Sequence, residues 1–82
     1  MSGEPITAFG LVIKQLRKAR GYSQEALASE ASIDRTFLSQ METGRKQPSL
    51  LTIFRLAGAL QLDASEVLRQ VESKMGSTHA TW

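Results

Sequence analysis

One face of the segment 34–43 carries four polar side chains that could hydrogen-bond to the edges of DNA bases: Arg35, Thr36, Ser39 and Gln40. Arginine can donate two hydrogen bonds to guanine, glutamine can pair with adenine, and threonine offers a methyl group to thymine. An isolated face of this kind is usually only solvated. Its neighbours along the chain therefore decide whether it reads DNA.

Residues suited to the phosphate backbone lie on both sides of this face. The segment 14–55 holds eight basic and four acidic side chains, whereas the net charge of the whole chain is only +2. A positive middle favours contact with phosphate groups. Helix N-termini add backbone N–H groups that attract anions. The residues expected to contact phosphate are Gln24, Thr43, Arg45, Lys46 and Ser49.

Amphipathic periodicity predicts five helices that position these residues. Apolar residues spaced three and four apart predict a first helix over about 7–20. Ser23, Asp34 and Ser49 are suitable N-caps for the next three helices, and Asp63 with Glu66 resembles a capping box for the fifth. Ser32 and Ile33 are expected to form the turn between the second and third helices, and the third helix should end near residue 43.

The predicted fold class is all-α, a compact five-helix bundle in which two short helices and a tight turn form a helix-turn-helix. Eighty-two residues allow one domain. We assign residues 7–75 to it, with a flexible arm over 1–6 and a disordered tail over 76–82. Two such domains could place their reading helices in successive major grooves and read a palindrome.

The fifth predicted helix offers a surface for such a dimer. Its apolar stripe, Val67, Leu68, Val71 and Met75, is wider than one small bundle needs. We expect Leu68 to pack inward and Val67, Val71 and Met75 to meet a partner. The alternative is that the whole stripe is intramolecular core.

Composition argues against enzymatic chemistry and against cofactors. The chain has no cysteine, and its single histidine, His79, lies in the predicted tail. Neither a nucleophile–histidine pair nor a thiolate or imidazole metal site is available in the folded part. We expect no metal, no cofactor and no small-molecule ligand. The lack of a signal peptide and of a membrane-length apolar run predicts a cytoplasmic protein.

The chain also resembles a known family. Ser23-Gln-Glu-Ala-Leu-Ala, followed by Leu38-Ser-Gln-Met-Glu-Thr-Gly and Pro48-Ser-Leu, is similar to the phage repressor and Cro-type (XRE-like) regulators. The resemblance covers about residues 9–70. The segment 34–42 is most similar to restriction–modification controller proteins.

This resemblance implies a lambda repressor-like domain that binds a palindromic operator in double-stranded DNA as a homodimer. At matching family positions, Gln24 contacts phosphate, Arg45 meets the backbone, and Arg35, Thr36 and Gln40 approach bases. The resemblance also implies that Arg17 and Glu42 meet and hold the third helix on the scaffold. Ser32 departs from the glycine that many members carry in the turn.

The sequence thus predicts a sequence-specific transcriptional regulator, and the resemblance favours the controller type. Two alternatives use the same helices. An antitoxin would bind its operator and also a toxin, and it would usually need an additional arm. A helical interaction module that binds no DNA would not need the basic loop or the Arg35 and Gln40 face.

Overall fold

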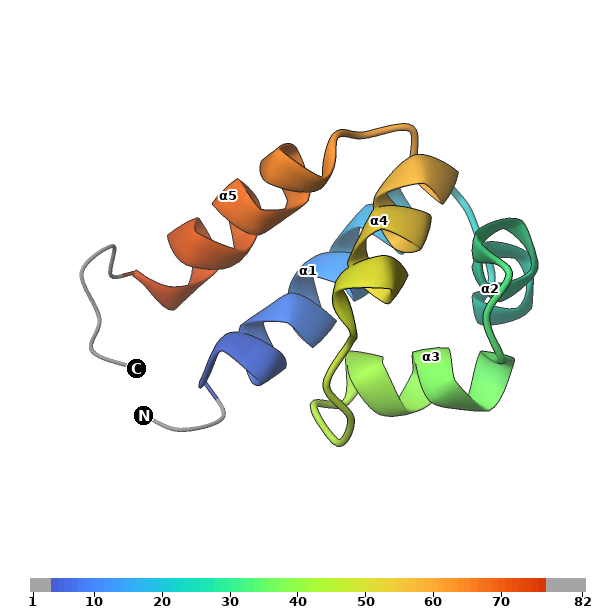
Figure 1. Ribbon diagram of the computed structural model, residues 1–82, viewed down its shortest axis with the longest axis horizontal. Helices are drawn as coiled ribbons and strands as arrows, with labels where there is room; N and C mark the ends of the chain where they lie inside the picture. The colour runs from blue at the N-terminus through green and yellow to red at the C-terminus, as the bar shows by residue number, and fades with distance from the viewer. Residues whose placement is uncertain (1–3, 77–82) are drawn as a thin grey trace.

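The computed structural model describes residues 4–76, which form five helices (Figure 1). They are α1 Glu4–Ala19, α2 Gln24–Ala31, α3 Arg35–Glu42, α4 Leu50–Ala59 and α5 Ala64–Met75. The expected all-α fold class is confirmed. Within these residues, no helix is long and apolar enough to cross a membrane.

Local sequence signals set most of the helix boundaries. The side chains of Ser23, Asp34 and Ser49 each accept a hydrogen bond from a backbone N–H in the first turn of the helix that follows. Helix α1 begins at Glu4, three residues before the predicted start. The early start is possible because proline is tolerated in the first turn, where Pro5 lies. The expected arm is thereby reduced, and the rest of it and nearly all of the expected tail lie outside the described residues.

The fifth helix differs from its predicted cap. Asp63 occupies the N-cap position, but its side chain accepts no capping hydrogen bond. The carboxylate of Glu66 instead accepts hydrogen bonds from Arg69 and Gln70. The capping box is therefore wrong, although the helix begins where it was expected.

The core lies between α1, α4 and α5 and extends beneath α2 and α3. Helix α1 is central and packs most extensively against α5 on one side and α3 on the other (Figure 1). The apolar residues that α1 and α5 bury include Phe9, Val12, Ile13, Val67 and Val71. This arrangement leaves Arg35 and Thr36 of α3 exposed on the outer side of the bundle.

The predicted orientation of α5 is wrong. Val67 is fully buried, Val71 is 5% exposed, and Met75 packs partly against the core, whereas Leu68 is 40% exposed. Because α5 lies directly on α1, the core takes the face on which Val67, Val71 and Met75 lie. Val67 and Val71 are therefore not available to a partner chain.

Candidate DNA-binding surface

The turn between α2 and α3 lies at Ser32 and Ile33, where the sequence predicted it. Ser32 adopts a left-handed conformation with φ 58° and ψ 44°. The backbone N–H groups of Ser32 and Ile33 donate to carbonyls in the last turn of α2. Asp34 then caps α3 by accepting a hydrogen bond of 3.2 Å from the N–H of Phe37. The two helices are thus joined by a short connection that ends α2 and caps α3 with hydrogen bonds.

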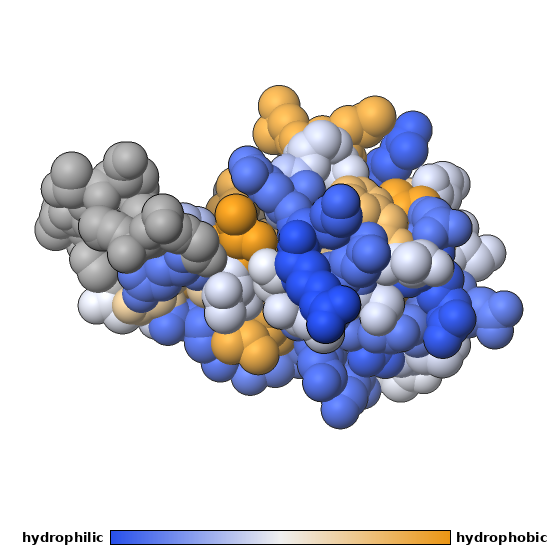
Figure 2. All heavy atoms as spheres, turned by 90° about the horizontal axis from the view of Figure 1, so that it is seen from below, coloured by the Kyte–Doolittle hydropathy of each residue, from blue (hydrophilic) through white to orange (hydrophobic). Residues whose placement is uncertain are grey.

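Helix α3 divides cleanly between a buried side and an outward side. Leu38 and Met41 are fully buried. Arg35 and Thr36 are exposed, and Ser39 and Gln40 are partly exposed. The structure therefore brings the four expected base-reading residues to one outer helix face. Seen from the side on which α3 lies, the molecule is predominantly hydrophilic (Figure 2).

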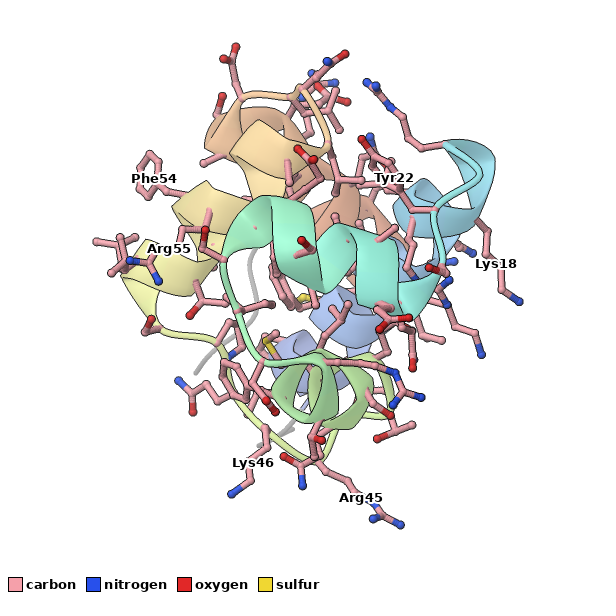
Figure 3. The ribbon with its side chains drawn as sticks, turned by 90° about the vertical axis from the view of Figure 1, so that its right-hand side faces the viewer. Lys18, Tyr22, Arg45, Lys46, Phe54 and Arg55 are labelled. Atoms are coloured by element: carbon pink, nitrogen blue, oxygen red, sulfur yellow. The ribbon has the colours of Figure 1, made fainter. Side chains whose placement is uncertain are left out.

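The loop between α3 and α4 places two cations beside this face. Gly44 has φ +79°, and the backbone N–H of Arg45 donates to the carbonyl of Gln40 over 2.8 Å. This turn reverses the chain at the end of α3. Arg45 and Lys46 then project from the lower end of the molecule, next to α3 (Figure 3).

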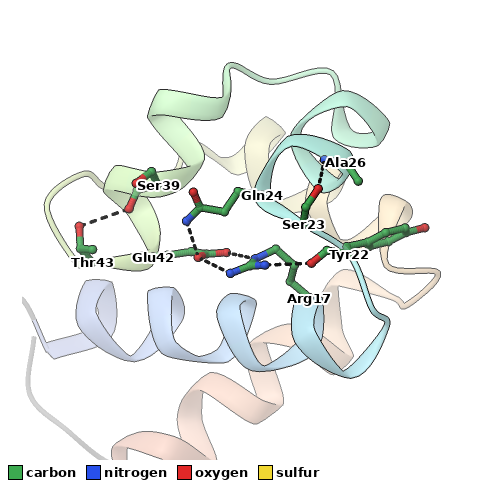
Figure 4. Close-up of polar contacts among 8 residues, drawn as sticks. All are labelled: Arg17, Tyr22, Ser23, Gln24, Ala26, Ser39, Glu42 and Thr43. Carbon is green, nitrogen blue, oxygen red and sulfur yellow. Dashed lines mark hydrogen bonds and ion pairs between the residues drawn. The ribbon is translucent and has the colours of Figure 1, made fainter.

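A buried network holds the end of α3 against α1 (Figure 4). Arg17 donates to Glu42 twice, from Nε over 2.7 Å and from Nη2 over 3.1 Å. Its Nη1 atom donates to the carbonyl of Tyr22 over 2.9 Å. The two charged side chains are only 10% and 2% exposed. The expected pair of Arg17 and Glu42 is confirmed.

The network also includes a residue that the sequence did not connect to it. Gln24 donates from Nε2 to Glu42 Oε1 over 2.9 Å. This bond joins the first residue of α2 to the last residue of α3, and it uses one of the two hydrogens on the Gln24 amide. The second hydrogen remains able to donate to a phosphate. Sequence spacing gave no signal for this contact, because it depends on how α2 and α3 cross.

The other residues expected to contact phosphate differ in whether their hydroxyl hydrogens are free to donate. Thr43 donates its hydroxyl to the carbonyls of Ser39 and Gln40, so its hydrogen is directed into its own helix. Ser49 accepts from the N–H of Thr52 and pairs with the Thr52 hydroxyl over 2.9 Å. If Thr52 is the donor there, the Ser49 hydrogen can reach a phosphate. The geometry favours Gln24, Arg45, Lys46 and Ser49 over Thr43.

Comparison with known proteins agrees with this geometry. Residues 13–67 match the helix-turn-helix family HTH_3. The chain belongs to this family. As a member it is a DNA-binding transcriptional regulator of the controller-protein type and not an enzyme.

Individual relatives cover most of the chain. The chain is 33% identical over 67 residues to the control protein C.MunI of Mycoplasma, covering 80% of this chain and 90% of that protein. The restriction-modification controller protein C.AhdI of Aeromonas hydrophila is 37% identical, with a TM-score of 0.74 over 76% of this chain and 94% of that one. The clp gene regulator ClgR of Corynebacterium glutamicum is 25% identical, with a TM-score of 0.84 over 88% and 77%.

Proposed function

We propose that this regulator binds a palindromic operator as a homodimer, with α3 of each protomer in the major groove, and that it acts as a controller protein of a restriction–modification system. The observation that supports this most directly is the outer face of α3. It presents the exposed side chains of Arg35 and Thr36 and lies beside the cations of the following loop.

Each group of residues has a separate task in this proposal. Arg35, Thr36, Ser39 and Gln40 read base edges. Gln24, the first residue of α2, and Ser49, the N-cap of α4, donate to phosphates at helix N-termini, where backbone N–H groups add to the attraction. Arg45 and Lys46 attract the phosphate backbone through their positive charge, and this part of the binding does not depend on base sequence. The similarity to C.MunI and C.AhdI supports the assignment to controller proteins.

Selection from a random duplex library tests the operator proposal, because the protein itself chooses its binding sequence. The full chain should enrich an inverted repeat whose half-site centres are about 10 base pairs apart, one turn of the duplex. Arg35→Ala should enrich a repeat with one relaxed position in each half-site. Lys46→Ala should enrich the same sequence as the unchanged protein, at lower overall affinity. Enrichment of no sequence would contradict specific recognition.

A further inference from the structure

The exposed side of α1 carries basic residues that the proposed DNA contacts do not include. Lys14 and Lys18 are both exposed and stand four positions apart, the spacing at which two side chains share one helix face. We call this pair the α1 lysine edge. The segment 7–23 around it holds four basic residues and no acidic one. The edge is therefore a positively charged strip on the surface of the domain, separate from Arg45 and Lys46.

Folding of the chain does not account for the α1 lysine edge. A cation in the last turn of a helix suits the helix dipole, and this explains Lys18. Lys14 lies one turn earlier, where it gains little from the dipole and repels Lys18, because like charges four positions apart destabilise a helix. The ion pairs within residues 4–76 are made by Arg17 and Arg69, so in this part of the chain no carboxylate neutralises either lysine. The edge is thus available to a negatively charged partner.

The α1 lysine edge borders the start of α2, where a phosphate contact is expected. Arg17, which precedes Lys18 in α1, donates to Glu42 and to the carbonyl of Tyr22. Glu42 in turn accepts from Gln24, the first residue of α2. These bonds hold the last turns of α1 beside the N-terminus of α2. The edge, on the exposed side of the same turns, therefore lies next to the expected phosphate donor Gln24.

Lys18 projects in a different direction from the cations of the loop between α3 and α4. Arg45 and Lys46 project from the lower end of the molecule, whereas Lys18 projects sideways, on the side opposite Phe54 (Figure 3). A duplex held against α3 and the lower cations extends past α3, with a phosphate roughly every 3.4 Å along each strand. Its backbone can therefore pass the α1 lysine edge on one side of the groove that α3 occupies.

We propose that the α1 lysine edge binds phosphates of the duplex that flanks the bases read by α3. Charge and position both favour this partner, because the DNA backbone is a row of negative charges and the edge continues the expected phosphate contacts outward from Gln24. Phosphates carry no sequence information directly, so the edge adds affinity and fixes the register of the protein without reading bases. This inference rests on the operator binding of the proposed function and lengthens the DNA segment that each protomer holds.

Titrations on a short and a long operator duplex test the inference. The short duplex ends at the outer edge of each selected half-site, and the long one carries a further turn, about 10 base pairs, of random sequence on each side. The double variant Lys14→Gln with Lys18→Gln should bind the short duplex like the unchanged protein and the long duplex more weakly.

The salt dependence gives the size of the effect. Each lysine that neutralises a phosphate contributes about 0.9 to the slope of log affinity against log salt concentration. On the long duplex alone, the double variant should lose about 1.8 of this slope for each bound protomer. Between 50 and 200 mM salt, its affinity should therefore fall about 12-fold less per protomer than that of the unchanged protein.

Two control variants separate the α1 lysine edge from other positive charge. Lys74→Gln removes an exposed charge from α5, which packs on the side of α1 away from α3 (Figure 1), and should leave both titrations unchanged. Lys46→Ala should weaken binding to both duplexes, because its loop lies beside α3 and within the half-site. Glutamine has nearly the helix propensity of lysine, so circular dichroism should show unchanged helix content in the double variant.

Two results would overturn the inference: a double variant with the affinity and salt slope of the unchanged protein on the long duplex, or an equal loss on both duplexes. Neither result contradicts the proposed function while the unchanged protein prefers its operator to random DNA. If the unchanged protein prefers no sequence, the proposed function fails, and the double variant is compared on a long random duplex. An unchanged salt slope there would overturn the inference as well, and a reduced slope would support phosphate binding by the edge.

Discussion

Replacement of Glu42 by alanine tests how strongly the buried network holds α3 against α1. The Glu42 carboxylate accepts three hydrogen bonds, two from Arg17 and one from Gln24, while its side chain is only 2% exposed. Without it, the buried guanidinium of Arg17 keeps a single protein partner, the carbonyl of Tyr22. The variant therefore leaves a positive charge inside the protein with most of its compensation removed.

The expected loss of stability is large for a chain of this size. Removing one partner of a buried ion pair costs about 3–5 kcal/mol. The whole domain should be stable by about 4–12 kcal/mol, at 0.05–0.15 kcal/mol per residue. Since 1 kcal/mol corresponds to about 4–8 °C in a domain of fewer than 100 residues, Glu42→Ala should lower the melting temperature by at least about 12 °C.

Thermal melting followed by circular dichroism, at neutral pH, measures this effect. Glu66→Ala is the matched control, because Glu66 pairs with Arg69 on the surface of α5 and should contribute at most about 1 kcal/mol. Arg17→Met combined with Glu42→Leu should recover part of the loss by replacing both charges with apolar groups. If the melting temperature of Glu42→Ala is as close to that of the unchanged protein as the melting temperature of Glu66→Ala is, the reasoning from burial is refuted.

Two further pairs of variants test the DNA contacts and the packing of the helices. Arg35→Ala should cost about 1–3 kcal/mol on a selected operator and much less on random DNA, in titrations at two salt concentrations; equal loss on both would make Arg35 a phosphate contact. Lys46→Ala should weaken both DNAs equally and reduce the salt slope by about one. Gly10→Ala should lower the melting temperature, because the added carbon would collide with the carbonyl of Met41 where α1 crosses α3. In Gly58→Ala the added carbon meets open space, so this variant should raise the stability by about 0.5–1 kcal/mol. Shifts of the melting temperature in the same direction for both glycine variants would contradict this explanation.

Local signals allowed most of the fold to be predicted from the sequence. The caps Ser23, Asp34 and Ser49 fixed three helix starts, because a side-chain oxygen that accepts a backbone N–H acts within one turn. The turn at Ser32 and Ile33 was also predicted at its observed place between two capped helices, whereas its left-handed conformation is seen only in the structure. The outward position of the polar side chains of α3 was predicted correctly as well, since its polar and apolar residues separate at helical spacing.

Features that depend on neighbouring elements could not be predicted in this way. In α5, a stripe containing both Val67 and Leu68 is compatible with either residue facing inward, and only the position of α1 decides between them. The bond between Gln24 and Glu42 depends on how two helices cross. The exposed apolar residues of α4, Leu50, Leu51 and Phe54, did have a sequence signal: α4 carries more apolar residues than one buried face requires.

The packing of α1 on α5 also has a consequence for synthesis on the ribosome. The first helix completes its core only with the last one, so α1 to α4 leave the exit tunnel before Val67 and Val71 can cover the apolar side of α1. Until then, side chains such as Phe9 are open to unwanted contacts in the nascent chain. Helix α3 forms in the middle of the chain, but it rests on α1, whose own core is complete only after the final helix has emerged.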